Sequence, residues 1–164
     1  MNRCAAYALA GLALWATWAT AEQTTHNVGD WVITAEGDPS GRGPRVIAQL
    51  VQPSRAVAVR CLSHDLSIAL TKPVASGPGP MQPDATYAVQ FQADQNDVIN
   101  TYAIGLSDTA MHVVAPKRMV AQIADAKEFT FRVTSNSGTT EVWTFEAGAA
   151  KHALAEVVKE CPVD

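Results

Sequence analysis

The chain has 164 residues and carries 12 basic against 16 acidic side chains, which gives a net charge of −4 at neutral pH. This length fits one domain with its own hydrophobic core. Lys117-Arg118 is the only adjacent basic pair. The composition therefore argues against nucleic-acid binding, which requires clustered lysine and arginine.

Residues 1–21 have the pattern of a secretory signal peptide. A short positive start precedes an apolar run from Cys4 to Trp18, and small residues follow up to Ala21. This order predicts cleavage between Ala21 and Glu22. Cys4 lies too early in the apolar run to carry a lipid anchor and leaves with the signal. We therefore expect an exported domain over residues 22–164, with no further membrane span.

Alternation of apolar and polar residues predicts most of the elements that follow, because successive side chains of a strand point to opposite faces. A polar lead-in (22–30) precedes a strand led by Trp31. Two loops rich in glycine and proline are expected, Glu36 to Pro44 and Val74 to Ala85. Strands are predicted at residues 31–34, 45–52, 56–62, 66–71, 87–92, 98–106, 111–114, 129–134 and 140–145.

Two helices are expected among these strands. Pro116 suits the first turn of a short helix, since its missing N–H costs nothing there. That helix would place Met119, Val120 and Ile123 on one face. The last element has helical spacing instead of alternation: its apolar stripe consists of Ala150, Leu154, Val157 and Cys161, and Pro162 ends it.

Cys61 and Cys161 are the two cysteines that remain after signal removal. Cys61 lies on the apolar face of a predicted strand, and Cys161 on the apolar stripe of the final helix. An even pair in an exported domain predicts a disulfide. Closing a loop of about 100 residues is worth up to about 4.7 kcal/mol in the chain-entropy model.

Ser63-His64-Asp65 contains the residue types of a hydrolase triad. Adjacent residues of a strand point to alternating sides, whereas a working triad converges in space. The motif G-x-S-x-G is also absent. We favour a turn with ordinary polar side chains, and a hydrolase using Ser63 and His64 remains an alternative.

The other candidate sites have simple structural readings. Cys61-x-x-His64 lacks a second pair of metal ligands, and Asp94-x-Asn96 lacks the glycine and the closing glutamate of a calcium loop. Trp31 and Trp143 are expected to fill the core more readily than to line a ligand groove. We predict no metal, no cofactor and no catalytic residue. The two long loops remain the expected recognition surface.

Several landmarks of the chain resemble the small exported accessory proteins of type VI secretion clusters, the VasI-like group. The landmarks are Gly29-Asp30-Trp31, Val57 to Cys61, Leu66 to Leu70, Tyr87 to Phe91, Val114 to Ile123, and Phe145-Glu146-Ala147-Gly148 leading to Cys161. That group has an arginine and an aspartate in its central strand, and this chain has Gln90 and Gln92 or Ala93 instead. Gly-Asp-Trp also resembles the invasion-associated locus B proteins, whose additional cysteines have no counterparts here.

Both resemblances imply a β-rich exported fold and an accessory role, and neither supplies an active-site residue. The sequence thus predicts a mainly β, antiparallel, sandwich-like domain with a short internal helix and a C-terminal helix. We expect a non-catalytic interaction module in the periplasm of a Gram-negative bacterium or outside the cell, with an envelope or secretion-system protein as partner. A secreted inhibitor or host-directed factor is the second reading.

Overall fold

The computed structural model describes residues 23–37, 43–72 and 81–163. The predicted signal peptide, its cleavage site between Ala21 and Glu22, the middle of the first predicted loop (38–42) and the first part of the second (74–80) lie outside these residues.

Ten strands form the framework. They are β1 (Gln23–Val28), β2 (Trp31–Glu36), β3 (Arg45–Gln52), β4 (Arg55–Leu62), β5 (Asp65–Thr71), β6 (Thr86–Ala93), β7 (Ile99–Gly105), β8 (Ala110–Val113), β9 (Glu128–Thr134) and β10 (Thr140–Glu146). All pair antiparallel in one sheet with the order β1-β2-β3-β4-β5-β8-β7-β6-β9-β10. The prediction of a mainly β, antiparallel domain is therefore confirmed.

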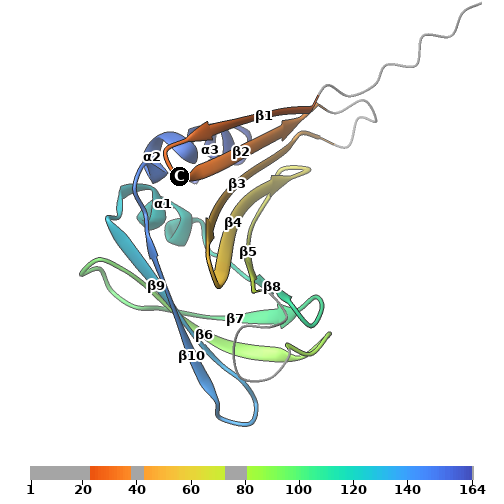
Figure 1. Ribbon diagram of the computed structural model, residues 1–164, viewed down its shortest axis with the longest axis vertical. Helices are drawn as coiled ribbons and strands as arrows, with labels where there is room; N and C mark the ends of the chain where they lie inside the picture. The colour runs from red at the N-terminus through yellow and green to blue at the C-terminus, as the bar shows by residue number, and fades with distance from the viewer. Residues whose placement is uncertain (1–22, 38–42, 73–80, 164) are drawn as a thin grey trace, which may run out of the picture.

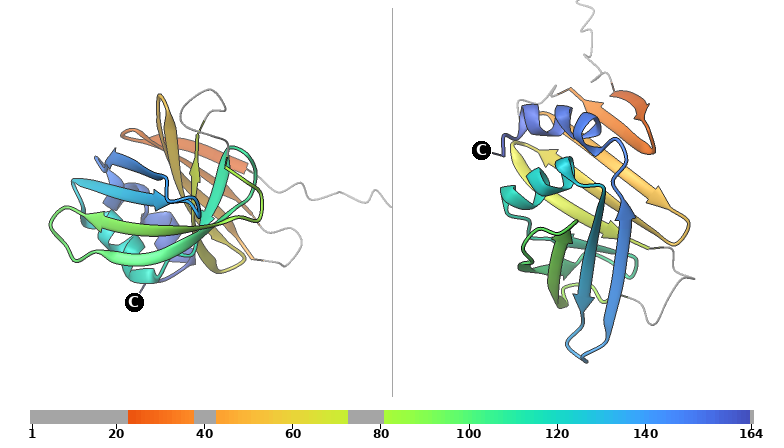
Figure 2. Two further views of the ribbon diagram at one scale, coloured as in Figure 1. Left: turned by 90° about the horizontal axis from the view of Figure 1, so that it is seen from below. Right: turned by 90° about the vertical axis from the view of Figure 1, so that its left-hand side faces the viewer.

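The sheet bends sharply where β5 meets β8. Figure 1 shows β1–β5 and β6–β10 as two halves at a steep angle, with the helices in the angle between them, and Figure 2 shows the same arrangement from below and from the side. The inner faces of both halves form one hydrophobic cluster. Phe91, Phe129, Phe131 and Phe145 pack together there, with ring centroids 5.1 to 6.3 Å apart. The bend thus lets one sheet enclose its own core.

The helices cover this inner side. The internal helix α1 (Lys117–Asp125) begins after Pro116 and buries Met119, Val120 and Ile123, as predicted. The C-terminal segment forms two short helices, α2 (Ala150–Ala153) and α3 (Ala155–Glu160), in place of the single helix expected. The chain kinks at Leu154, yet all four residues of the predicted apolar stripe are buried. No helix of the described residues is long and apolar enough to cross a bilayer.

The polar lead-in differs from the expectation, because residues 23–28 form the edge strand β1. Gly29, at a φ of 60°, and Asp30 make the two-residue turn into β2. Nearly every β1 side chain is exposed. The strand therefore lacks the alternation of buried apolar and exposed polar residues by which a strand is recognised in a sequence. Trp31 anchors this end of the sheet, since its buried ring donates from Nε1 to the Ala147 carbonyl at 2.8 Å.

Candidate binding groove

A cavity of about 700 Å³ opens where the bent sheet brings the end of β5 toward β10. Its volume falls within the range of typical small-molecule sites, roughly 300–1,000 Å³. Its lining combines buried apolar side chains with polar residues of the β9–β10 segment. The described lining residues are Lys72, Met81, Gln82, Ala85, Thr86, Tyr87, Met111, Val133, Ser135, Asn136, Ser137, Thr139 and Glu141.

Lys72 is the most unusual group in this groove. Its side chain is only 7% exposed, and Nζ lies 2.8 Å from Oε1 of Glu141, whose side chain is 26% exposed. The other carboxylate oxygen of Glu141 accepts a hydrogen bond from Trp143 Nε1 at 3.1 Å. An ammonium group has three N–H donors, and Glu141 is the one hydrogen-bond acceptor of Nζ among the described residues. The groove therefore contains a buried cation that is paired with one carboxylate within the described part of the chain.

The turn between β9 and β10 contributes the polar residues Ser135, Asn136, Ser137 and Thr139 to the groove. Ser135, Ser137 and Thr139 place their hydroxyls close together, with Ser135 Oγ 2.8 Å from Ser137 Oγ. Gly138, at a φ of 84°, closes this turn. The turn is exposed, so its hydroxyls can exchange water for the polar groups of a ligand at little cost.

Two contacts hold the halves of the sheet together beside the groove. Arg55 Nη1 donates to the carbonyl of Val142 at 2.9 Å, and the Lys72–Glu141 ion pair lies at the same border. Each contact joins the β4–β5 region to the edge strand β10. The Arg55 contact also occupies a backbone acceptor that an edge strand would otherwise expose to another chain.

The candidate triad residues lie away from this groove. Ser63 and His64 form the two-residue turn between β4 and β5, both with positive φ (54° and 67°). His64 Nδ1 lies 3.3 Å from the carbonyl of Glu160, and no hydrogen bond joins the Ser63 and His64 side chains among the described residues. The predicted turn is confirmed, and its geometry brings no nucleophile to a base.

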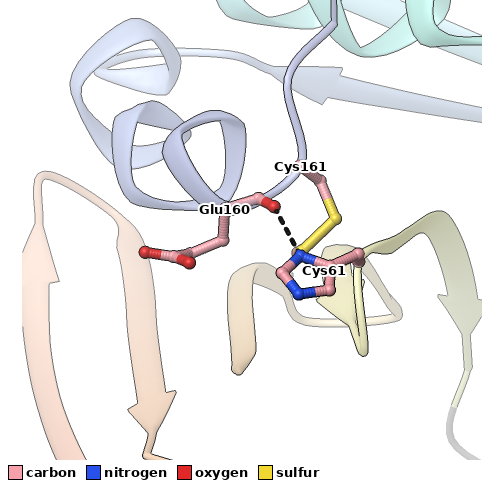
Figure 3. The surroundings of a disulfide bond; sticks show 4 residues. Cys61, Glu160 and Cys161 are labelled. Atoms are coloured by element: carbon pink, nitrogen blue, oxygen red, sulfur yellow. Dashed lines mark hydrogen bonds between the residues drawn. A yellow bond between two sulfur atoms is a disulfide. The ribbon is translucent and has the colours of Figure 1, made fainter. Parts of the chain in front are cut away.

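The predicted disulfide is present: Cys61 and Cys161 are bonded, with their Cα atoms 5.7 Å apart. Figure 3 shows how the bridge joins the end of the C-terminal helix to the sheet, with the Glu160 carbonyl beside it. Both cysteines are buried, at 0% and 3% exposure. Cys61 is therefore bound to sulfur and does not act with His64 as a metal ligand.

The other singled-out residues are also placed. Trp31 and Trp143 are buried in the core, as predicted. The Asp94 carboxylate accepts hydrogen bonds from the backbone N–H groups of Lys127 and Glu128, which lower its pKa. Within the described part of the chain, no three His, Cys, Asp or Glu residues cluster as metal ligands would.

The sequence reasoning missed Lys72 and Glu141, because each looked like an ordinary charge at a strand end or on an exposed strand face. The available signal was weak: Lys72 directly follows the strongly apolar strand β5, and Glu141 lies two residues before Trp143, hence on the same face. No pattern in the sequence indicates that these two residues meet.

Comparisons with known proteins show the fold alone. No protein-family model matches the chain, and no curated protein matches it. Among solved structures it is similar to the crystal structure of invasion associated protein b from Bartonella henselae, with a TM-score of 0.57 and 19% identity, over 83% of this chain and 95% of that one. The resemblance to invasion-associated locus B proteins is thereby supported at the level of fold, and that to the VasI-like group stays a prediction.

Proposed function

We propose that the chain is a non-catalytic interaction module of the periplasm or the extracellular medium, and that it binds its ligand in the groove between β5, β6 and the β9–β10 turn. The observation that carries this proposal is the buried Lys72 ammonium, which is paired with Glu141 at the wall of a 700 Å³ cavity. A buried ion pair is costly to maintain, so a ligand that adds polar contacts to this pair would bind with a clear gain.

Export is supported by the Cys61–Cys161 bridge, because structural disulfides persist in oxidising compartments. Cell fractionation with thiol labelling tests this point. The expected result is mature protein in the periplasm or the medium with no free thiol. Recovery in the cytoplasm with two alkylatable thiols would contradict it. An envelope or secretion-system protein is the partner that we propose for the periplasmic form.

Photo-crosslinking in the native host tests the groove. A benzoylphenylalanine at Ser137, on the groove rim, should give a discrete adduct in wild-type protein. The adduct should disappear with Lys72→Met. The matched control is the same probe at Gln95, which is exposed in the turn at the far end of β6. Equal labelling from both positions, or an adduct indifferent to Lys72, would overturn groove binding.

A secreted, host-directed factor is the second candidate. The fold similarity to a protein described as invasion associated favours it. Release into the medium during contact with host cells, with little protein left in the periplasm, would support this reading.

The enzyme alternative is tested with the double variant Ser63→Ala/His64→Ala. Under the non-catalytic proposal, this variant retains the Ser137 adduct. Loss of the adduct together with loss of a hydrolytic activity that wild type shows would favour the enzyme alternative.

A further inference from the structure

Apolar side chains are concentrated on the outer face of β7 and on the residues that flank the strand, with Asn100 between them. Four of the six large apolar side chains that are exposed among the described residues lie within nine consecutive positions: Val98, Tyr102, Ile104 and Leu106, at 37% to 53% exposure. The solvent face of an antiparallel sheet is ordinarily polar, as β6 shows with Gln90 and Gln92. We call Val98, Tyr102, Ile104 and Leu106 the β7 stripe.

A cation without a carboxylate lies next to this stripe. His112 of β8 is the register partner of Ile104 and so shares its face. Arg60 of β4 reaches across β5 and donates from Nη2 to His112 Nδ1 at 3.2 Å. The residues beneath it on β5, Ser67 and Ala69, are each only 7% exposed. The half-buried Arg60 side chain therefore extends toward the β7 stripe.

The residues directly opposite Arg60 on both neighbouring strands are uncharged. Its register partners are Ile47 on β3 and Ser67 on β5, and its hydrogen-bond partner His112 is an acceptor, hence neutral at this nitrogen. Nε of Arg60 is buried and has no hydrogen-bond partner in the described part of the chain. No ion pair joins Arg60 to a carboxylate within the described residues, although the chain carries 16 acidic side chains. The complement of this surface is an anionic group flanked by apolar ones.

We infer that the β7 stripe and Arg60 form a docking surface for a partner-protein segment that presents a carboxylate between apolar side chains. The carboxylate pairs with the outer N–H groups of the guanidinium, at Nη1 and at the remaining N–H of Nη2, because Nε is buried and the other Nη2 N–H is bound to His112. The apolar neighbours cover Tyr102 and Ile104. This surface lies on the outer side of the sheet, whereas the groove residues Tyr87, Met111 and Val133 lie on the inner side. The two sites are therefore independent.

A phage-displayed library of random twelve-residue peptides, selected on the oxidised full-length mature protein, tests the inference. The expected consensus carries Asp or Glu with apolar residues on both sides. Synthetic consensus peptide, followed by fluorescence anisotropy, should lose affinity at least about tenfold with Arg60→Gln and with Tyr102→Ser/Ile104→Ser. It should bind normally to Val51→Ser and to Arg118→Gln, which alter an exposed valine on β3 and an exposed arginine on α1.

Each other outcome overturns the inference. The inference fails if no acidic consensus is enriched. It also fails if the consensus peptide binds wild type and Arg60→Gln with equal affinity. Peptides sensitive to Lys72→Met instead would assign recognition to the groove and leave the proposed function intact. Self-association in light scattering that Tyr102→Ser/Ile104→Ser abolishes would make a second copy the occupant. Unchanged thermal unfolding and the absence of free thiol establish that each variant is folded.

Discussion

Lys72 Nζ lies 2.8 Å from Oε1 of Glu141, across 69 positions of sequence, and this contact joins the end of β5 to the edge strand β10. The two residues belong to the two halves of the bent sheet. Their ion pair is thus both a structural link beside the groove and the groove's main polar feature.

Breaking this pair from one side should destabilise the protein. Lys72→Met leaves the Glu141 carboxylate largely buried without its cation, at an expected cost of about 1–3 kcal/mol in the free energy of unfolding. Urea denaturation measures this. The matched control is Lys151→Met, which removes an ion pair with Asp125 whose side chains are 76% and 71% exposed. An equal effect of both substitutions would contradict the burial argument. The double variant Lys72→Met/Glu141→Gln should recover part of the loss.

The disulfide should contribute strongly to stability. Replacing Cys61 and Cys161 together by alanine releases a loop closed over a sequence separation of 100, and the chain-entropy model gives a loss of up to about 4.7 kcal/mol. Chemical denaturation of this variant and of wild type, each with and without reductant, measures the effect. Reductant should lower the free energy of unfolding of wild type toward that of the variant, and it should leave the value of the variant unchanged. A variant as stable as the oxidised protein would show that the bridge adds nothing.

Gly105 should not accept a side chain. A Cβ at this position would lie 2.0 Å from the carbonyl oxygen of Gln82. Two backbone hydrogen bonds fix this close approach: the Gly105 N–H donates to the Ala85 carbonyl, and the Asp84 N–H donates to the Gly105 carbonyl. Gly105→Ala must therefore push two backbones apart, with a loss of about 1–3 kcal/mol. Gly37→Ala is the control, because a Cβ at Gly37 meets nothing within 4 Å. Equal melting temperatures for both variants would contradict the close approach.

His112 should make stability depend on pH. Burial, and then the neighbouring Arg60 cation, lower the pKa of His112 below its ordinary value. The unfolded chain therefore binds a proton at His112 more readily than the folded protein does. As a result, the free energy of unfolding falls as the pH decreases below about 6.5. His112→Gln keeps an acceptor for Arg60 without a titrating ring. The unfolding free energy of this variant should vary less between pH 7.5 and 5 than that of wild type.

The exposed His152 on α2 provides the control for this experiment. His152→Gln should retain the wild-type pH dependence. A steep dependence that survives His112→Gln would assign the effect to another group.

The residue pattern alone was enough to identify the elements whose side chains are buried on one face. Val57, Val59 and Cys61 alternate on β4, Met119, Val120 and Ile123 share one side of α1, and the stripe ending at Cys161 reaches the core, because burial imposes a period that can be read from the residues. This reasoning also predicted the bridge. It failed at β1, whose exposed side chains carry no such period, and at Leu154, where the final helix divides.

Which strands meet became known only from the folded chain. The pairings of β5 with β8 and of β6 with β9 join residues far apart in the sequence, and the hydrophobic pattern of a strand identifies its buried face without naming its neighbour. The bend between β5 and β8 then brings Lys72 to Glu141, and the pairing of β4, β5 and β8 places His112 within reach of Arg60. These pairs are side-chain contacts across strands, so the charged part of each candidate surface arises from long-range packing, whereas the β7 stripe is local in the sequence.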